Sequence, residues 1–582
     1  MGVVWVSDGA AVDGLPVPGL AGLRCAPDAL VAVAEAGPVR AAVLGRCSVS
    51  KDAVRAAALA AVRSGRWSEV TRWPGSYWVV VDDGRRRFVT GDLAGCRAVF
   101  WAPTSTGFVW SSQAARVAAA VGGRPDLALL AARTVAGAEH WPTQSVYCGV
   151  RQVPGGFGLL TTGERGELVD VAALPAPRSM EEAAPAVADA LDAAVAAAIG
   201  DAEEVSADLS GGLDSSTVVM TAVRSVPVRA ATYAGPLASV EDTAFARRVA
   251  AATGVAHHVC EGDESTWSFA VEPPVATDGP SLAAANAGMD AAYLRPVAGA
   301  AVHLTGHGGD VVLESSSAAF TDLLQRGRRR EAHTAVVAYA RAIDQAPGPM
   351  WRQVKEGSAG RREALRAAAE RVAAGLPEPG SNVWSWCRIG GASAWLTADG
   401  RAVVADLLRA SAAGNGDGLA GEWDDWAALR MGGAVARDEE PLLDVLGVRP
   451  AHPFLDNVMV RACFTVPAAE RRRTGLYKPL LAAARPDLPA WLTGRCSKGS
   501  FGPVLLSGLR ANRSRLQALL EASPLVNALF DVSAVVGALR TAAAGDARAP
   551  LPALHQLLSS SQWLEGLSAM AVPPAAAGSA AC

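Results

Sequence analysis

Residues 206–220, SADLSGGLDSSTVVM, constrain the fold more than any other stretch of the chain. A short apolar segment precedes the glycines, and a helix-like segment follows them. Strand-like and helix-like segments then alternate through 226–234, 241–253, 256–260 and 301–306. This alternation is typical of a parallel, doubly wound sheet, in which ligands bind at the carboxyl ends of the strands. The glycine-rich stretch therefore predicts a ligand-binding loop in an α/β domain.

The composition of this loop suits a phosphate group. Gly211 and Gly212 let backbone N–H groups approach an anion at the start of a helix, where the helix dipole also attracts it. Further donors are the hydroxyls of Ser210, Ser215 and Ser216. Asp214 would repel a phosphate unless a cation lay between them, so we expect Asp214 to hold Mg²⁺. A glycine turn with a serine cap is the alternative that local chemistry leaves open.

The first 170 residues have a different pattern. Short strand-like runs at 76–83, 86–92, 98–103 and 107–112 are separated by turn residues, which predicts an antiparallel sheet. A helix is expected over 179–200, with Ser179 as its N-cap and Glu182 three residues later. The region from about 315 to 520 is expected to be largely helical, and the final residues, AVPPAAAGSAAC, to be disordered.

Charge and composition exclude several classes of function. The formal net charge of −4 gives no reason to expect binding to nucleic acid or to anionic membrane. The sequence shows neither an apolar run long enough to span a membrane nor a secretory signal, so we expect a cytoplasmic protein. The nine cysteines form no CxxC pair and show no zinc-type spacing. Only four of the 53 basic residues are lysines, which singles out each lysine as a candidate functional residue.

The loop SGGLDSS resembles the pyrophosphate-binding loop of the ATP pyrophosphatases that form acyl-adenylates. HLTGHGGD (303–310), PFLD (453–456) and the segment 477–503 are similar to further motifs of asparagine synthetases. This resemblance covers some 300 residues and implies that the substrates include ATP with Mg²⁺. It implies Asp310 as a second metal carboxylate, beside Asp214. Its implied nucleotide-binding residues are Leu209, Ser210, Gly211, Gly212, Asp214, Ser215, Ser216, Tyr233, Gly306 and Gly308.

Two lysines fall within the last of these motifs. The resemblance implies that Lys498 contacts phosphate and stabilises the transition state of adenylation, because a fixed cation balances the negative charge that moves there. Lys478 is a second candidate catalytic residue, and a purely structural role remains open for it.

The front of the chain resembles an N-terminal-nucleophile glutaminase domain. Such a domain needs a cysteine directly after the initiating methionine, whereas this sequence begins Met1-Gly2-Val3. We therefore expect a degenerate domain that makes no ammonia from glutamine, unless processing exposes Cys25 or Cys47. The predicted organisation is an αββα glutaminase-like domain at 1–172, then an adenine-nucleotide α-hydrolase-like, doubly wound domain with helical additions at 178–520. A C-terminal helical segment and tail follow at 521–582.

Loss of the ammonia source implies another nucleophile. The relatives that dispense with glutamine are β-lactam synthetases, carbapenam-type cyclases and lasso peptide cyclases. β-Lactam synthetases carry a glutamate where this sequence has Arg449, which disfavours that group. The motif at 303–310, the nearby TDGPS (277–281) and the arginine-rich composition favour a lasso peptide cyclase similar to asparagine synthetase B.

Such a cyclase would join an Asp or Glu side chain of a precursor core peptide to the peptide's own α-amine. A leader peptidase and a leader-binding protein are the other partners that this resemblance implies. The alternatives are an asparagine synthetase that uses free ammonia, a β-lactam synthetase-like ligase, and a non-enzymatic ATP-binding chaperone of the peptide.

One further group of residues is a candidate for contacts with a peptide. It comprises Trp384, Trp386 and Trp395, for which a place in the core is an equal alternative. The arginine clusters 85–87, 326–330 and 471–473 are predicted to be solvated faces rather than binding sites.

Overall fold

The computed structural model describes residues 6–8, 14–105, 107–376, 384–414, 418–495, 499–546 and 548–571. The front of the chain forms two antiparallel six-stranded sheets, as the strand-like runs predicted. One sheet has the order β10-β8-β9-β1-β3-β2, and the other has the order β12-β11-β7-β6-β5-β4. Their strands are β1 Val6–Asp8, β2 Leu15–Pro16, β3 Leu23–Cys25, β4 Leu30–Ala36, β5 Val39–Cys47, β6 Gly75–Asp82, β7 Arg86–Thr90, β8 Val99–Thr104, β9 Gly107–Ser111, β10 Arg151–Val153, β11 Phe157–Thr162 and β12 Arg165–Asp170.

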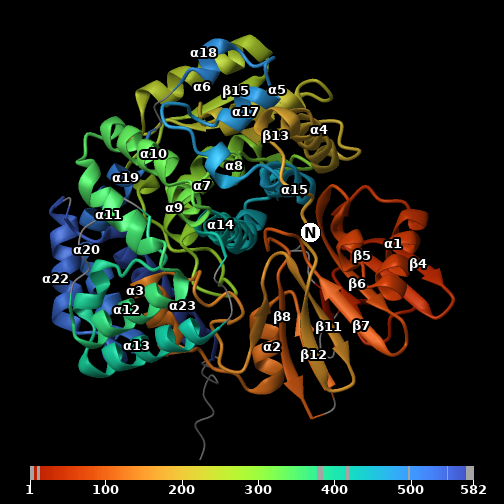
Figure 1. The fold of residues 1–582 in the computed structure, drawn as a ribbon, viewed down its shortest axis with the longest axis horizontal. Helices are drawn as coiled ribbons and strands as arrows, with labels where there is room; N and C mark the ends of the chain where they lie inside the picture. Colours follow the sequence, from red (N-terminus) through yellow and green to blue (C-terminus); the bar gives the residue numbers. More distant parts are fainter. Residues whose placement is uncertain are drawn as a thin grey trace, which may run out of the picture.

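The two sheets pack face to face and helices cover both outer faces (Figure 1). Successive side chains of β6 point to opposite faces of its sheet. Trp78 and Val80 face the other sheet, whereas Val79 and Val81 face outward. Helix α1 (Lys51–Ser64) packs on the outer face of the second sheet, and α2 (Ala114–Val121) packs on that of the first. Helix α3 (Leu127–Ala136) packs in the same core as α2 but contacts other helices. This four-layer arrangement confirms the predicted αββα domain.

A parallel five-stranded sheet follows, with the order β15-β14-β13-β16-β17. Its strands are β13 Val205–Asp208, β14 Val228–Tyr233, β15 Ala256–Cys260, β16 His303–Leu304 and β17 Pro450–Ala451. The helices that alternate with or cover them are α4 Met180–Ile199, α5 Leu213–Ala222, α6 Val240–Thr253, α7 Ala287–Leu294, α8 Gly309–Val312, α15 Asn457–Phe464 and α17 Pro479–Ala484. The doubly wound domain is therefore confirmed, and β13 lies at its centre.

Helix α4 begins where the sequence predicted. The Ser179 hydroxyl accepts from the backbone N–H of Glu182, and the Glu182 carboxylate accepts from that of Ser179, which completes a capping box. This helix, α15 and α17 share one hydrophobic core with the parallel sheet and with the outer face of the second antiparallel sheet. The two domains are thus joined by a continuous apolar interior.

Most of the remaining helices form a large helical region, as expected, whereas α18 (Ala490–Thr493) packs against α6 beside the parallel sheet. The others are α9 Ala318–Gln325, α10 Arg329–Ala342, α11 Pro347–Gly357, α12 Arg361–Ala373, α13 Ala398–Ala413, α14 Ala420–Val445, α16 Ala468–Arg471, α19 Gly502–Ala511, α20 Arg513–Ala522, α21 Pro524–Leu529, α22 Val532–Ala543 and α23 Leu551–Ala571. Helices α12, α13 and α19–α23 pack with α2 and α3 in a single second core (Figure 1). Within the described residues, no helix is long and apolar enough to cross a membrane.

The structure corrects the expectation for one arginine and decides where two of the three candidate tryptophans lie. Arg471 is not on a solvated face, because it is 1% exposed, forms an ion pair with Asp425 and donates to the carbonyl of Val312. Trp386 and Trp395 are buried core residues. The tail that we expected to be disordered lies outside the described residues.

Candidate nucleotide-binding and catalytic site

The site lies where the direction of the chain through the parallel sheet reverses. From β13 the chain continues to β14 and β15 on one side, whereas β16 and β17 lie on the other side. Strands β13 and β16 are adjacent and parallel, and short helices start directly after both, at Leu213 and Gly309. In an open α/β sheet such a reversal leaves a crevice at the carboxyl ends of the strands, where ligands bind.

The first loop of the crevice is held by its own serines. The backbone N–H of Ser210 donates to Ser215 Oγ over 3.1 Å, and the two hydroxyl oxygens are 3.0 Å apart. Gly211 has a φ of +80°, and a Cβ at this position would lie 2.0 Å from the carbonyl oxygen of Asp242. Only glycine fits such a position, so the tight loop depends on this residue.

The second loop, which follows β16, packs its glycines directly on the first. A Cβ on Gly306 would lie 2.5 Å from the backbone nitrogen of Ser215, and one on Gly309 would lie 2.3 Å from the Asp214 carboxylate. These approaches bring Asp310, the residue after Gly309, to the same end of the crevice as Asp214.

Lys478 joins the two carboxylates. Its side chain is fully buried, and its Nζ forms ion pairs with Asp214 and, over 2.7 Å, with Asp310 Oδ1. The Tyr477 hydroxyl donates to the same Asp310 oxygen over 3.1 Å. Burial alone lowers the pKa of Lys478, but the charges of Asp214 and Asp310 outweigh it, so that the pKa is raised and the ammonium stays charged.

The backbone of Lys478 is also unusual. It has a φ of +48° in the left-handed region, which a residue with a long side chain rarely adopts. Lys478 is the residue before Pro479, where α17 begins, so this turn directs the ammonium toward the crevice as the helix leads away. Backbone strain of this kind is found mainly at functional sites.

The two carboxylates fit a magnesium ion bound together with a nucleotide. Mg²⁺ in phosphate-transfer sites is held by one or two carboxylates and by the phosphates themselves. Asp214 and Asp310 already share one cation, the Lys478 ammonium, which shows that both face the same point. They are the residues that would hold Mg²⁺.

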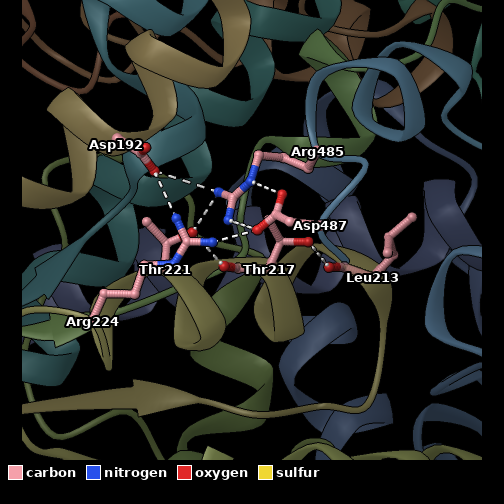
Figure 2. A network of polar contacts seen from close by, with 7 residues as sticks. All are labelled: Asp192, Leu213, Thr217, Thr221, Arg224, Arg485 and Asp487. Atoms are coloured by element: carbon pink, nitrogen blue, oxygen red, sulfur yellow. Dashed lines mark hydrogen bonds and ion pairs between the residues drawn. The ribbon is translucent and has the colours of Figure 1, made fainter. Parts of the chain in front are cut away.

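A network of polar contacts holds the helix that begins at the first loop (Figure 2). Arg485, at the end of α17, donates to Thr221 Oγ1 on α5 over 2.9 Å and forms an ion pair with Asp487 over 2.9 Å. Asp487 also pairs with Arg224, and Asp192 of α4 lies 3.4 Å from Arg485. The helices that carry Asp214 and Lys478 are therefore fixed to each other at the ends opposite these residues.

Other predicted nucleotide-binding residues lie around the same strand ends. Leu209 is buried, and its backbone N–H donates to the carbonyl of Ala231 on β14. The Tyr233 hydroxyl is 2.7 Å from Thr266 Oγ1, and Gly308 approaches the side chain of Leu455. Ser216 is fully buried on α5, and its hydroxyl has no hydrogen-bond partner among the described residues.

Lys498 lies outside the described residues, so its predicted catalytic role stays a prediction. The residues that flank this gap are held by Asp242 of α6, which forms an ion pair with Arg495 and accepts from the N–H of Gly499 over 3.1 Å. Arg495 also donates to the carbonyl of Gly211 over 2.6 Å. The sequence analysis did not predict Arg495 or Asp242 as residues of the site. The position of Arg495, three residues before Lys498, could have indicated it.

The cysteines of the front domain lack the properties of an activated nucleophile. Cys25 is buried in β3. Burial and the nearby Asp456 raise the pKa of Cys47 to about 12, and burial raises that of Cys96 well above its usual value. Because the thiolate is the reactive form, these thiols are poor nucleophiles at neutral pH.

A comparison with known protein families agrees with this geometry. The asparagine synthase family matches residues 186–565. A search among curated proteins finds no match. One similar solved structure is the glutamine phosphoribosylpyrophosphate amidotransferase from B. subtilis complexed with ADP and GMP, with 12% identity over 40% of this chain and 48% of that chain, and a TM-score of 0.17.

A second similar solved structure is that of the allosteric regulatory enzyme of purine biosynthesis. It has 13% identity over 48% of this chain and 56% of that chain, with a TM-score of 0.17. The chain thus spans about half the length of both structures.

Proposed function

Because the chain belongs to the asparagine synthase family, and is thus an ATP-dependent amide-forming ligase at the family level, we propose that it is a lasso peptide cyclase. The substrate would be a core peptide freed from its leader. An Asp or Glu side chain of this peptide would attack the α-phosphorus of ATP, and pyrophosphate would leave. The peptide's α-amine would then attack the activated carbonyl, release AMP and close a macrolactam.

One observation carries the proposal of adenylation. Two glycine-rich loops, two carboxylates and one buried ammonium meet at the ends of adjacent parallel strands, although they come from three distant parts of the chain. The loop Ser210–Ser216 offers N–H groups and hydroxyls to the departing pyrophosphate. Lys478 supplies a positive charge beside the phosphates, and Lys498 is proposed to supply another.

Mg²⁺, when bound, would neutralise phosphate charge and orient the nucleotide. Asp214 and Asp310 would hold it. Fixed hydrogen-bond donors and charges stabilise a transition state most strongly where water is excluded. Lys478 and Ser216 are fully buried, which is consistent with a site that excludes water.

The nucleophile is the second part of the proposal. Thiols with raised pKa in the front domain argue against glutamine-derived ammonia and favour an amine that arrives with the substrate. The front domain would then serve as a scaffold, and a leader peptidase and a leader-binding protein would act before the cyclase.

The test combines purified protein, ATP, Mg²⁺ and candidate leaderless peptides, with mass spectrometry of the peptide. The expected product has lost one water, and AMP with pyrophosphate accumulates in equal amount. Formation of ADP and orthophosphate would contradict adenylation. An asparagine synthetase would instead convert aspartate and ammonia to asparagine with no peptide present, and a β-lactam synthetase-like ligase would cyclise a small amino acid derivative.

A further inference from the structure

A cavity of about 50 Å³ lies between the front domain and the elements that follow it, and its walls are different from those of the nucleotide site. Arg46, near the end of β5, and Arg97, just before β8, line it from the front domain. Glu440 of α14 and Leu455 line it from the other side. A water molecule needs roughly 10–15 Å³ of such space, so the cavity has room for a few waters or for one small ligand.

Arg46 is a charged residue of this cavity that has no partner. It is partly buried, and within the described part of the chain its guanidinium forms no hydrogen bond and no ion pair. Burial and the neighbouring charge of Arg97 lower its pKa to about 10, so it still carries its charge at neutral pH. Burying a charge without a partner is costly, and a guanidinium that faces a cavity in this way indicates an anion that binds beside it.

The carboxylates that line the cavity already have donors of their own. Glu440 forms an ion pair with Arg97 over 2.9 Å. Asp92 accepts from the backbone N–H of Arg97 over 3.1 Å, and Asp456 accepts from that of Gly75 over 2.6 Å. Because none of them pairs with Arg46 among the described residues, the cavity keeps a surplus of hydrogen-bond donors.

Arg437 of α14 adds to this surplus. It lines the same cavity, and its Nε forms an ion pair with Asp438 over 3.0 Å. Its Nη1 is buried and has no hydrogen-bond partner among the residues that the structure describes. A ligand that accepts hydrogen bonds therefore suits this cavity better than a cation or a hydrogen-bond donor.

The other side chains in the walls favour an organic anion over an inorganic one. Ala194 of α4, Ala436 and Leu455 give the cavity an apolar part. Phosphate would turn some of its oxygens toward these side chains, which offer no donors. A carboxylate has only two oxygens, both of which match the fork of one guanidinium, and its aliphatic part can lie against the apolar walls.

We propose that this cavity binds a small aliphatic carboxylate through Arg46. The inference goes beyond the proposed function and does not depend on it. Since residues from both sides of the domain boundary line the cavity, the bound carboxylate contacts both and stabilises their packing. A ligand that binds only the folded protein in this way raises its melting temperature.

The test uses sodium propionate with the full chain at about pH 7.5, where a carboxylic acid is ionised. Saturation-transfer NMR of the propionate methyl protons measures binding, and calorimetric melting with equal sodium chloride as reference measures stabilisation. We expect saturable binding and a higher melting temperature in propionate. Arg46→Gln should bind at least about tenfold more weakly, because it loses the charged fork. Arg85→Gln removes an exposed arginine from the turn between β6 and β7, and it should bind like the unaltered protein.

Arg46→Gln removes an unpaired charge, so without propionate its melting temperature should equal or exceed that of the unaltered protein. Lack of saturable binding by the unaltered protein would overturn the proposal. Equal binding by folded Arg46→Gln would place the propionate elsewhere and overturn it too. Displacement of propionate by inorganic phosphate at equal concentration would assign the cavity to a bare oxyanion, against the proposed carboxylate.

Discussion

The ammonium of Lys478 lies 2.7 Å from the carboxylate of Asp310, inside a crevice where nucleotide phosphates are expected to bind. The same ammonium pairs with Asp214, so one lysine neutralises both carboxylates that are proposed to hold Mg²⁺. Entry of the metal with its nucleotide would change this balance, because the lysine would then share the carboxylates with a divalent cation and gain phosphate oxygens as partners. We therefore propose that Lys478 takes part in the chemistry of the site as well as in its structure.

Replacing Lys478 by methionine should abolish adenylation. The methionine keeps the length of the side chain but leaves Asp214 and Asp310 uncompensated, and loss of a fixed charge beside reacting groups costs about 100-fold or more. Pyrophosphate exchange measures the effect, and Lys355→Met, an exposed lysine on α11, is the matched control. Equal exchange rates in the two variants would contradict a role for Lys478.

The two carboxylates should differ in what they contribute to stability. The Asp310 side chain is 54% exposed and that of Asp214 is 11% exposed. We expect Asp310→Asn to raise the Mg²⁺ concentration needed for half-maximal activity by about tenfold or more with little change in melting temperature. Asp214→Asn should raise the required Mg²⁺ concentration in the same way. It should also lower the melting temperature, because it leaves the buried Lys478 ammonium without the charge of Asp214. Unchanged Mg²⁺ dependence in both would exclude these residues as metal ligands.

Arg485 should act on the site only by holding its helices. Arg485→Met breaks the contacts with Thr221 and Asp487, and we expect a loss of about 1–2 kcal/mol in the free energy of unfolding, since Asp487 is partly solvated. Arg224→Met, which removes a half-exposed partner of the same Asp487, should cost about 0.5 kcal/mol or less. Urea unfolding distinguishes the two, and equal losses would argue against the buried contact to Thr221.

Glu439 should make the protein less stable as the pH rises. Burial and the charge of Asp208 raise its pKa to about 7 in the folded state, above the usual value near 4.5. The folded protein then binds this proton more tightly than the unfolded chain, so the contribution of Glu439 to stability falls between about pH 4.5 and pH 7. Glu439→Gln should flatten this part of the pH profile of unfolding. An identical profile in the variant would show that Glu439 does not titrate in this range.

Cys47 should resist alkylation in the folded protein. Its pKa is raised to about 12 by burial and by Asp456, whereas Cys148 is exposed and its pKa is raised mainly by modest burial. Iodoacetamide at about pH 8 should therefore modify Cys148 first and Cys47 only after unfolding. Peptide mapping by mass spectrometry gives the order, and early labelling of Cys47 would reopen the case for a nucleophile in the front domain.

Local patterns were enough to predict most of the secondary structure. The capping box at Ser179 and the glycine loop before Leu213 depend on residues within a few positions of each other, so a sequence window contains all of their partners. Burial was harder to predict, and Arg471 was wrongly expected on the surface because its partner Asp425 lies on another helix.

The sequence by itself determined the order of the elements, the glycine positions that let two loops touch, and the residue types that suit a nucleotide. Only the tertiary structure decided that Lys478 meets Asp214 and Asp310, and that Asp208 meets Tyr293 and His303. These contacts depend on the order of strands in the sheet and on which helix faces pack together. Both are set by the burial of the whole apolar interior, which no short stretch of sequence contains.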